Sequence, residues 1–195
     1  MKRFSMIINK LKTILKNILG IKYYSLGKNS SVEYPNKIMN PSKDNTKLTI
    51  GKNSNIHCQI QILGHGGQVH IGDDCFIGEN SYIWSGISIK IGNRVLIGHN
   101  CNVFDTDVHP FDKDERHIQF KKIFSSGHPK NINLHDVEVV IEDDVWIGAN
   151  VTVLKGTRIG KGAIIGAGSI VTKNIEPFTV NAGSPSKILR RLDEK

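Results

Sequence analysis

The hydrophobic pattern of this chain repeats every sixth residue, where an isoleucine or a valine returns through most of residues 50–171. The fifteen positions on this spacing are Ile50, Ile56, Ile62, Ile71, Ile77, Ile83, Ile91, Ile97, Val103, Ile141, Ile147, Val153, Ile159, Ile165 and Val171. They form groups of three, with short shifts of phase at 68–70 and 89–90. A six-residue repeat held over this distance predicts a β-solenoid.

Two other columns of the repeat describe the shape of each coil. The fourth residue after each repeat position is usually small or β-branched: Ser54, Cys75, Ser81, Val95, Cys101, Val145, Val151, Thr157, Ala163 and Ser169. The third is usually Asn, Asp or Gly, as at Asn53, Asp74, Asn80, Asn100, Asp144, Asn150, Gly156, Gly162, Gly168 and Asn174. These three residue types accept left-handed backbone angles at low cost. Each hexad is therefore predicted to be a short strand and a tight corner, and three hexads close one triangular coil. A sandwich of unrelated strands would not keep this phase.

The two ends of the chain are predicted to be helical. In residues 1–24 an apolar stripe (Phe4, Ile7, Ile8, Leu11, Ile14, Leu15, Ile18 and Leu19) opposes Lys2, Arg3, Lys10, Lys12 and Lys16. Such a helix would cap the open end of the solenoid or lie on an anionic membrane surface. Ser184 and Pro185 are typical of a helix start, which predicts a C-terminal helix over 184–195. The solenoid is assigned to 50–183.

Composition limits the partners that we expect. The chain has 195 residues, enough for one domain, and its net charge is +8. Because the basic residues do not alternate with aromatic residues on one stripe, no nucleic-acid partner is expected, and the charge favours a phosphorylated small molecule or an anionic surface. Cys75 and Cys101 lie in the small column and Cys58 lies outside it. Three cysteines do not suggest a disulfide framework, and buried thiols are consistent with the cytoplasm.

Residues 104–138 interrupt the repeat, and this excursion loop begins directly after an intact hexad. A long segment on a rigid scaffold is often functional. His109 lies near the start of the loop, with Asp105 and Asp107 four and two residues before it. Its imidazole can take a proton from a hydroxyl if a fixed acceptor holds the other ring nitrogen. Either aspartate, or a backbone carbonyl, can be that acceptor.

Several motifs resemble the hexapeptide-repeat acetyltransferases, in particular the galactoside, maltose and capsular-sugar O-acetyltransferase branch. They are the hexads themselves, the Asp-Val-His-Pro run at 107–110, and the segments 143–150, 166–173 and 182–187. The resemblance extends over about residues 50–193. It implies a left-handed parallel β-helix, a homotrimer, and an acyl-CoA site between neighbouring subunits.

The same resemblance implies roles for individual residues. His109 would be the general base for direct attack of a hydroxyl on the thioester, and Trp146 would pack beside the reacting centre. Backbone N–H groups near Gly148 and Ala149 would stabilise the oxyanion. The coenzyme would contact Gly148, Ala149, Ala167, Thr172, Lys173, Lys187 and Arg190. The resemblance implies acetyl-CoA as cosubstrate and no metal.

The acceptor end departs from the family pattern. Sugar acetylases of this group carry an acidic or amide residue in the segment corresponding to 78–88, and this chain has glycine where an aspartate is expected. Trp84 can stack on a sugar ring, and Asn80 and Ser85 can bind its hydroxyl groups. The identity of the acceptor stays open.

The sequence therefore predicts acetyl transfer from acetyl-CoA to a hydroxyl of a sugar or surface polysaccharide, in the cytoplasm or at the inner face of the membrane. Alternatives on the same site are N-acetylation of an amino sugar and acetylation of an antibiotic. A carbonic-anhydrase-like zinc trimer would need a histidine upstream of His65 and His70, and the sequence offers none at a suitable spacing. A non-catalytic assembly module would not need His109.

Overall fold

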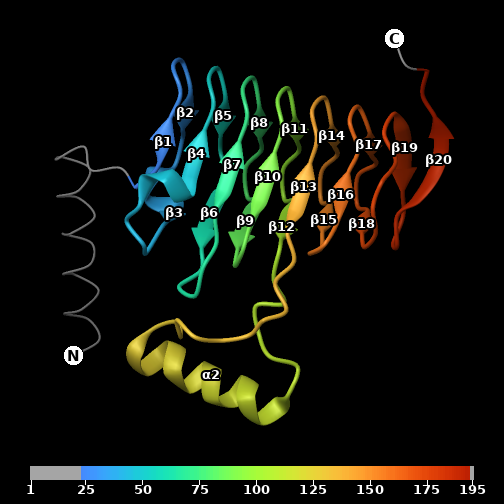
Figure 1. Ribbon diagram of the computed structural model, residues 1–195. Helices are drawn as coiled ribbons and strands as arrows, with labels where there is room; N and C mark the ends of the chain where they lie inside the picture. Colours follow the sequence, from blue (N-terminus) through green and yellow to red (C-terminus); the bar gives the residue numbers. More distant parts are fainter. Residues whose placement is uncertain (1–22, 194–195) are drawn as a thin grey trace.

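The computed structural model describes residues 23–193, which form a parallel β-helix with three sheets (Figure 1). Sheet A contains β1 (Ser25–Leu26), β4 (Leu48–Ile50), β7 (Val69–Ile71), β10 (Ile89–Ile91), β13 (Val139–Ile141) and β16 (Arg158–Ile159). Sheet B contains β2 (Ser31–Val32), β5 (Asn55–Ile56), β8 (Phe76–Ile77), β11 (Leu96–Ile97), β14 (Trp146–Ile147), β17 (Ile164–Ile165), β19 (Thr179–Ala182) and β20 (Lys187–Arg191). Sheet C contains β3 (Ile38–Met39), β6 (Gln59–Ile62), β9 (Tyr82–Ser85), β12 (Asn102–Phe104), β15 (Thr152–Val153) and β18 (Ile170–Val171).

Repeat positions from successive coils lie directly above one another in the core. In sheet B, for example, Ile77, Ile97, Ile147 and Ile165 are register partners in turn. These side chains are at most 1% exposed, so the six-residue period is the period of burial. Sheet C contains one exception, because Ile83 pairs with Ile60 while the predicted repeat position Ile62 pairs with Ser85.

The corners have the predicted backbone geometry. Positive φ angles of 54–64° occur at Asn53, Asp74, Asn80, Asn100, Asp144 and Asn150. Gly156, Gly162 and Gly168 have φ of 65–72° at equivalent positions. Asn and Asp tolerate this region and Gly enters it without strain, which explains why these residue types recur at the corners.

The β-helix begins one coil earlier than the predicted boundary at residue 50. Leu26, Val32 and Ile38 are also six residues apart and pack against the core. The 3₁₀ helix η1 (Pro35–Lys37) lies between β2 and β3 within this coil, and a segment containing η2 (Asn45–Lys47) joins the coil to the next. Ile38 and Ile50 are two repeat lengths apart, but the position between them is Asp44, so the apolar repeat is interrupted there.

The predicted C-terminal helix is wrong, because β20 is a strand that pairs antiparallel with β19. The edge of β19 offers unpaired backbone groups, and a short segment satisfies its own backbone better there than in an isolated helix. The predicted N-terminal helix lies outside the described residues, apart from Tyr23 and Tyr24. Within residues 23–193, no helix is long and apolar enough to cross a membrane.

The excursion leaves the β-helix after β12 and returns at β13, as predicted, but it contains a helix that the sequence analysis did not expect. Helix α2 (Lys113–Ser126) lies away from the sheets (Figure 1). The Asp112 carboxylate caps its N-terminus by accepting hydrogen bonds from the N–H groups of Asp114 and Glu115. This cap satisfies two of the backbone donors that a helix start leaves free.

The three thiols are buried in the core, including Cys58, which the pattern had left outside the small column. Burial raises the pKa of Cys58 to about 12 and also raises the pKa values of Cys75 and Cys101. Thiolates are the reactive form, so these cysteines serve as compact apolar side chains.

Candidate active site

The two limbs of the excursion are joined at its base. The N–H of Val137 donates to the carbonyl oxygen of Asp105 at 2.8 Å, and the N–H of Asp107 donates to that of Leu134 at 3.3 Å. Lys155 Nζ then bridges the Asp107 carboxylate and the carbonyl oxygen of His135. The loop therefore starts from a fixed base, which holds the backbone just before His109.

Asp105 anchors this base from inside the β-helix. Its side chain is fully buried, and its carboxylate accepts hydrogen bonds from Ser85 Oγ at 2.7 Å and from the N–H groups of Gly86 at 2.6 Å, Ile87 at 3.1 Å and Ser88 at 2.7 Å. Burial raises the pKa of Asp105, and these hydrogen bonds act in the opposite direction. The predicted catalytic role of Asp105 is therefore replaced by a structural one.

Gln119 of α2 holds the imidazole of His109. The Gln119 side chain is 2% exposed, and its Nε2 donates to the carbonyl oxygen of Val108 at 3.0 Å. This bond fixes the amide orientation, so Oε1 is the atom that faces His109 Nδ1 at 2.7 Å. An amide oxygen only accepts hydrogen bonds, so Nδ1 carries a proton, and in the neutral ring the other nitrogen, Nε2, has the lone pair.

This contact corrects the expectation that an aspartate or a backbone carbonyl orients His109. Asp107 instead pairs with Lys155, and Asp105 is occupied inside the prism. The signal that could have revealed Gln119 was the helix cap, because Asp112 followed by Glu115 three residues later is typical of a helix start.

Trp146 lies on the outer face of sheet B, where it is 54% exposed. The two predicted oxyanion donors, Gly148 and Ala149, follow it in the sequence. The N–H of Gly148 donates to Ile165 within the sheet, at 2.8 Å. In the described chain the N–H of Ala149 has no acceptor. Of the two amides, Ala149 is therefore the one that can bind an incoming oxygen.

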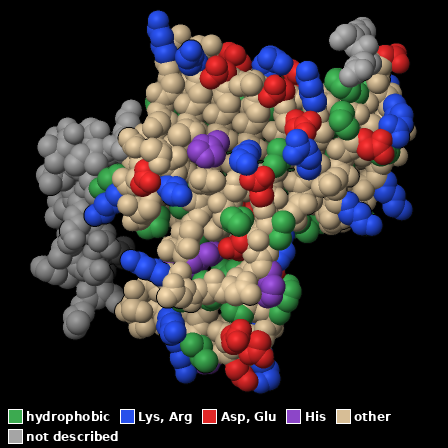
Figure 2. All heavy atoms as spheres, viewed as in Figure 1, with side chains coloured by type: hydrophobic (Ala, Val, Ile, Leu, Met, Phe, Trp, Pro, Cys, Tyr) green, Lys and Arg blue, Asp and Glu red, His purple; other side chains and the backbone are tan. Residues whose placement is uncertain are grey.

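The predicted coenzyme contacts fall on separate parts of the prism. Ala149 and Ala167 occupy successive corners between sheets B and C, and a Cβ on Gly148 would come within 2.7 Å of the Ala167 nitrogen. This close stacking leaves a narrow edge without large side chains. The remaining predicted contacts are Thr172 and Lys173, at a corner between sheets C and A, and Lys187 and Arg190, on β20. Figure 2 shows basic side chains at the C-terminal end of the β-helix.

The predicted acceptor residues are not brought together. Ser85 is fully buried, and its hydroxyl lies 2.7 Å from Asp105 Oδ2 and 3.0 Å from the carbonyl oxygen of Gln68, so its predicted contact with a sugar is wrong. Trp84 packs against Phe104, with 5.5 Å between ring centroids. Asn80 forms a corner between sheets B and C, just before β9, whereas Trp84 and Ser85 lie at the far end of that strand.

His109 and Trp146 lie on opposite sides of one prism. The excursion that carries His109 leaves at the edge between sheets C and A, and Trp146 lies in sheet B, which is the face opposite that edge. One subunit alone therefore does not place the base beside the tryptophan.

The histidines considered for a zinc trimer also have separate partners. His65 Nε2 pairs with Asp136 Oδ2 at 2.7 Å, and His70 Nδ1 contacts Thr49 Oγ1 at 2.8 Å. Among residues 23–193 no group of three or more His, Cys, Asp or Glu side chains is placed to hold a metal ion.

Comparison with known proteins agrees with this architecture. Residues 138–173 match the family described as bacterial transferase hexapeptide (six repeats), and residues 68–98 match the hexapeptide repeat of succinyl-transferase. The galactoside O-acetyltransferase of Lactococcus lactis is 35% identical over 147 residues, which are 74% of this chain and 63% of that protein. The chain belongs to the hexapeptide-repeat acetyltransferase family. The galactoside O-acetyltransferase of Escherichia coli is 31% identical, over 75% of this chain and 65% of its own length.

A solved member of the family has the same fold. A hexapeptide-repeat-containing acetyltransferase from Vibrio cholerae is 27% identical, with a TM-score of 0.57, over 93% of this chain and 81% of that chain. The predicted fold class, a left-handed parallel β-helix, is confirmed. The chain spans less than two thirds of the length of the two galactoside O-acetyltransferases.

Proposed function

We propose that this protein transfers an acetyl group from acetyl-CoA to a hydroxyl of a sugar or surface polysaccharide. The observation that carries the proposal is the His109–Gln119 pair, because it leaves a bare imidazole nitrogen on a fixed loop base. Two relatives are galactoside O-acetyltransferases, and the Vibrio cholerae protein has also been solved in complex with acetyl-CoA. These names support the donor and the acceptor class.

In this mechanism His109 Nε2 removes the proton from the acceptor hydroxyl as its oxygen attacks the thioester carbonyl. The tetrahedral oxyanion accepts a hydrogen bond from the Ala149 N–H. Collapse breaks the carbon–sulfur bond, and the imidazolium returns its proton to the thiolate of coenzyme A. The products are the acetyl ester and free coenzyme A, with no acyl-enzyme.

The placement of the base and the tryptophan supports a homotrimer with shared sites. His109 of one subunit would meet Trp146 and Ala149 of its neighbour, since a single chain keeps them on opposite sides. The pantetheine arm would follow the edge of Ala149 and Ala167. Lys173, Lys187 and Arg190 supply cations for the phosphates of coenzyme A.

The proposed location is the cytoplasm, where acetyl-CoA is made available and buried thiols stay reduced. Peripheral contact with the membrane through the basic N-terminal segment is part of this proposal. Its support is the sequence pattern alone, in which lysines oppose an apolar stripe.

Calorimetric titration with acetyl-CoA tests the proposal most directly. We expect saturable binding of about one acetyl-CoA per subunit, followed by thiol release when sugar acceptors are screened. A parallel titration with zinc should show no stoichiometric binding. A folded protein that does not bind acetyl-CoA would contradict the transferase assignment. Stoichiometric zinc binding would favour the carbonic-anhydrase-like alternative.

Replacing Gln119 with glutamate tests how His109 is held. A carboxylate beside Nδ1 stabilises the imidazolium, so the acid limb of the pH–rate profile should move to higher pH by about one unit. The substitution also replaces the Nε2 donor to the Val108 carbonyl with an oxygen, so the rate above that limb should fall by several-fold. An unchanged profile in a folded Gln119→Glu protein would show that Gln119 does not contact the working base.

A further inference from the structure

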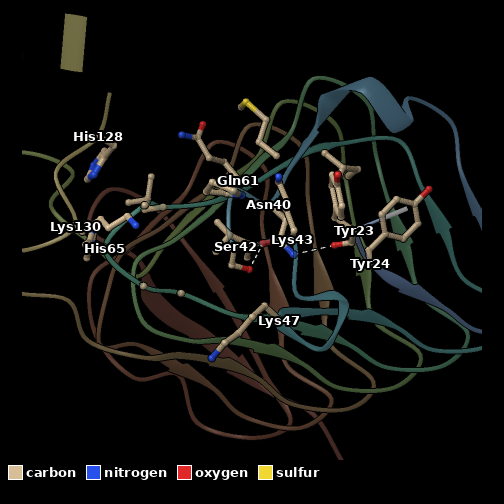
Figure 3. A pocket seen from close by; sticks show the side chains of 18 of the residues that line it. Tyr23, Tyr24, Asn40, Ser42, Lys43, Lys47, Gln61, His65, His128 and Lys130 are labelled. Atoms are coloured by element: carbon tan, nitrogen blue, oxygen red, sulfur yellow. Dashed lines mark hydrogen bonds between the residues drawn. The ribbon is translucent and has the colours of Figure 1, made fainter. Parts of the chain in front are cut away.

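A large cavity in the described chain lies near the N-terminal end of the prism, remote from Trp146. Its volume is about 1250 Å³. It is lined by the first coil, by residues 61–67, and by His128 and Lys130 of the returning limb of the excursion (Figure 3). Small-molecule sites commonly measure about 300–1,000 Å³, so this space can admit a ligand of nucleotide size or larger. Nothing in the acetyl-transfer mechanism uses this space.

The charged side chains that line the cavity are all basic. Lys43, Lys47 and Lys130 line it, and none of its described lining residues is Asp or Glu, although the chain has 18 acidic residues. In Figure 3, Lys130 lies at one end with His65 and His128, and Lys43 and Lys47 lie nearer to Tyr23 and Tyr24. These three exposed lysines come from two segments, and cations on the lining of one space raise the local potential for anions.

Two histidines in the wall have ring nitrogens without partners. The His65 side chain is 6% exposed, and its Nε2 is held by Asp136 Oδ2 at 2.7 Å, which leaves Nδ1 unpaired. His128 stacks on His65 with 5.2 Å between centroids, and its Nδ1 lies 2.9 Å from the carbonyl oxygen of Pro129, which leaves Nε2 unpaired. Buried polar atoms without partners are costly, roughly 1–3 kcal/mol each.

The fold makes room for this arrangement. A Cβ on Gly86 would lie 2.6 Å from Asp136 Oδ2 and 2.9 Å from His65 Nε2, so the absence of a side chain there permits the pair. With its Nε2–H directed to Asp136, neutral His65 presents Nδ1 as an acceptor, and neutral His128 presents Nε2 in the same way. Hydroxyl groups are the natural donors to two such acceptors.

We propose that this cavity binds a saccharide that carries a phosphate or diphosphate group. The lysines would hold the phosphate oxygens, and the two histidines would accept hydrogen bonds from hydroxyl groups. Resting on the proposed function, this inference assigns the cavity to the phosphorylated or diphosphate-linked end of an extended sugar acceptor, whose reacting hydroxyl lies outside the cavity. It places the anionic group of that acceptor in a site separate from the one for coenzyme A.

Binding of inorganic pyrophosphate, measured by calorimetry with acetyl-CoA at saturation, tests the anion site. We expect one pyrophosphate per subunit and at least tenfold weaker binding after Lys43, Lys47 and Lys130 are replaced together by glutamine. A matched triple replacement of Lys28, Lys52 and Lys161, which are exposed at corners between sheets A and B, should leave binding unchanged. Absence of binding, displacement by acetyl-CoA, or equal loss in the control would overturn the proposal.

Two diphosphate probes, one of which carries a sugar, then distinguish the sources of the diphosphate. UDP-galactose tests a soluble source of the diphosphate. Phosphatidylcholine vesicles that contain farnesyl diphosphate test a lipid-linked source. Binding of either should fall in the cavity triple variant, and binding of neither would overturn the assignment. His128→Ala should weaken galactose 1-phosphate at least threefold but leave pyrophosphate unchanged, and equal effects on both would remove the saccharide part. Pyrophosphate binding without acetyl-CoA binding would instead count against the transferase proposal alone.

Discussion

Replacing His109 with alanine is expected to lower kcat for acetyl transfer by about 10²–10⁴-fold, the usual contribution of a general base. The substitution removes the nitrogen that accepts the hydroxyl proton and leaves Gln119 bonded to Val108. The dissociation constant for acetyl-CoA should stay within about threefold, since the predicted coenzyme contacts lie elsewhere. Steady-state thiol release and calorimetry measure the two quantities on the same preparation.

His117→Ala is the matched control, because His117 is an exposed histidine on α2 that stacks on Phe120. Its kcat should equal that of the unmodified protein. A kcat for His109→Ala within threefold of the control, in a protein that still binds acetyl-CoA, would contradict the role of His109. That outcome would show that another group removes the hydroxyl proton.

The β-helix was predictable because its information is local. Each hexad specifies its own strand, its inward-facing Ile or Val, and its corner residue, so Asn100 or Gly168 indicates a corner without knowledge of any distant partner. Stacking then follows, since each coil can bury its apolar face only against the next. The sequence pattern did not reveal the first coil, because a non-repeating segment separates Ile38 from Ile50.

The features that sequence reasoning missed depend on partners far along the chain. β20 is a strand because β19 presents an open edge, and a local reading of residues 184–195 cannot contain that edge. Helix α2 lacks an apolar stripe, since its inward-facing residue is the buried amide Gln119. Its cap at Asp112 was the local signal, and it predicts a helix without indicating what Gln119 contacts.

The candidate site shows the same division. His109 was predicted from its position after an intact hexad and from the family resemblance. The roles of Asp105 and Ser85 were wrong because spacing cannot show that Asp105 reaches back 20 residues to bind the Ser85 hydroxyl inside the prism. A fully buried carboxylate can anchor the start of the loop but cannot reach an exposed imidazole.

Replacing Asp105 with alanine is therefore expected to lower the free energy of unfolding by about 3–5 kcal/mol, because each buried group that loses its hydrogen-bond partner costs about 1–3 kcal/mol. The loss leaves the N–H groups of Gly86, Ile87 and Ser88 without their acceptor in a site that water does not reach. Urea unfolding followed by circular dichroism measures the difference. Asp114→Ala is the control, because the Asp114 carboxylate is 77% exposed and pairs only with neighbouring Lys113.

The same substitution should also reduce activity in conditions where the protein remains folded, because Asp105 fixes the corner from which the excursion starts. The N–H of Val137 bonds to the backbone carbonyl of Asp105, so movement of that residue loosens both limbs of the loop that carries His109. We expect kcat to fall by at least tenfold with little change in acetyl-CoA affinity, since small displacements of a base are costly. Loss of stability with unchanged kcat would show that the loop base orients His109 without help from this carboxylate. Stability equal to that of Asp114→Ala would show that water replaces the carboxylate.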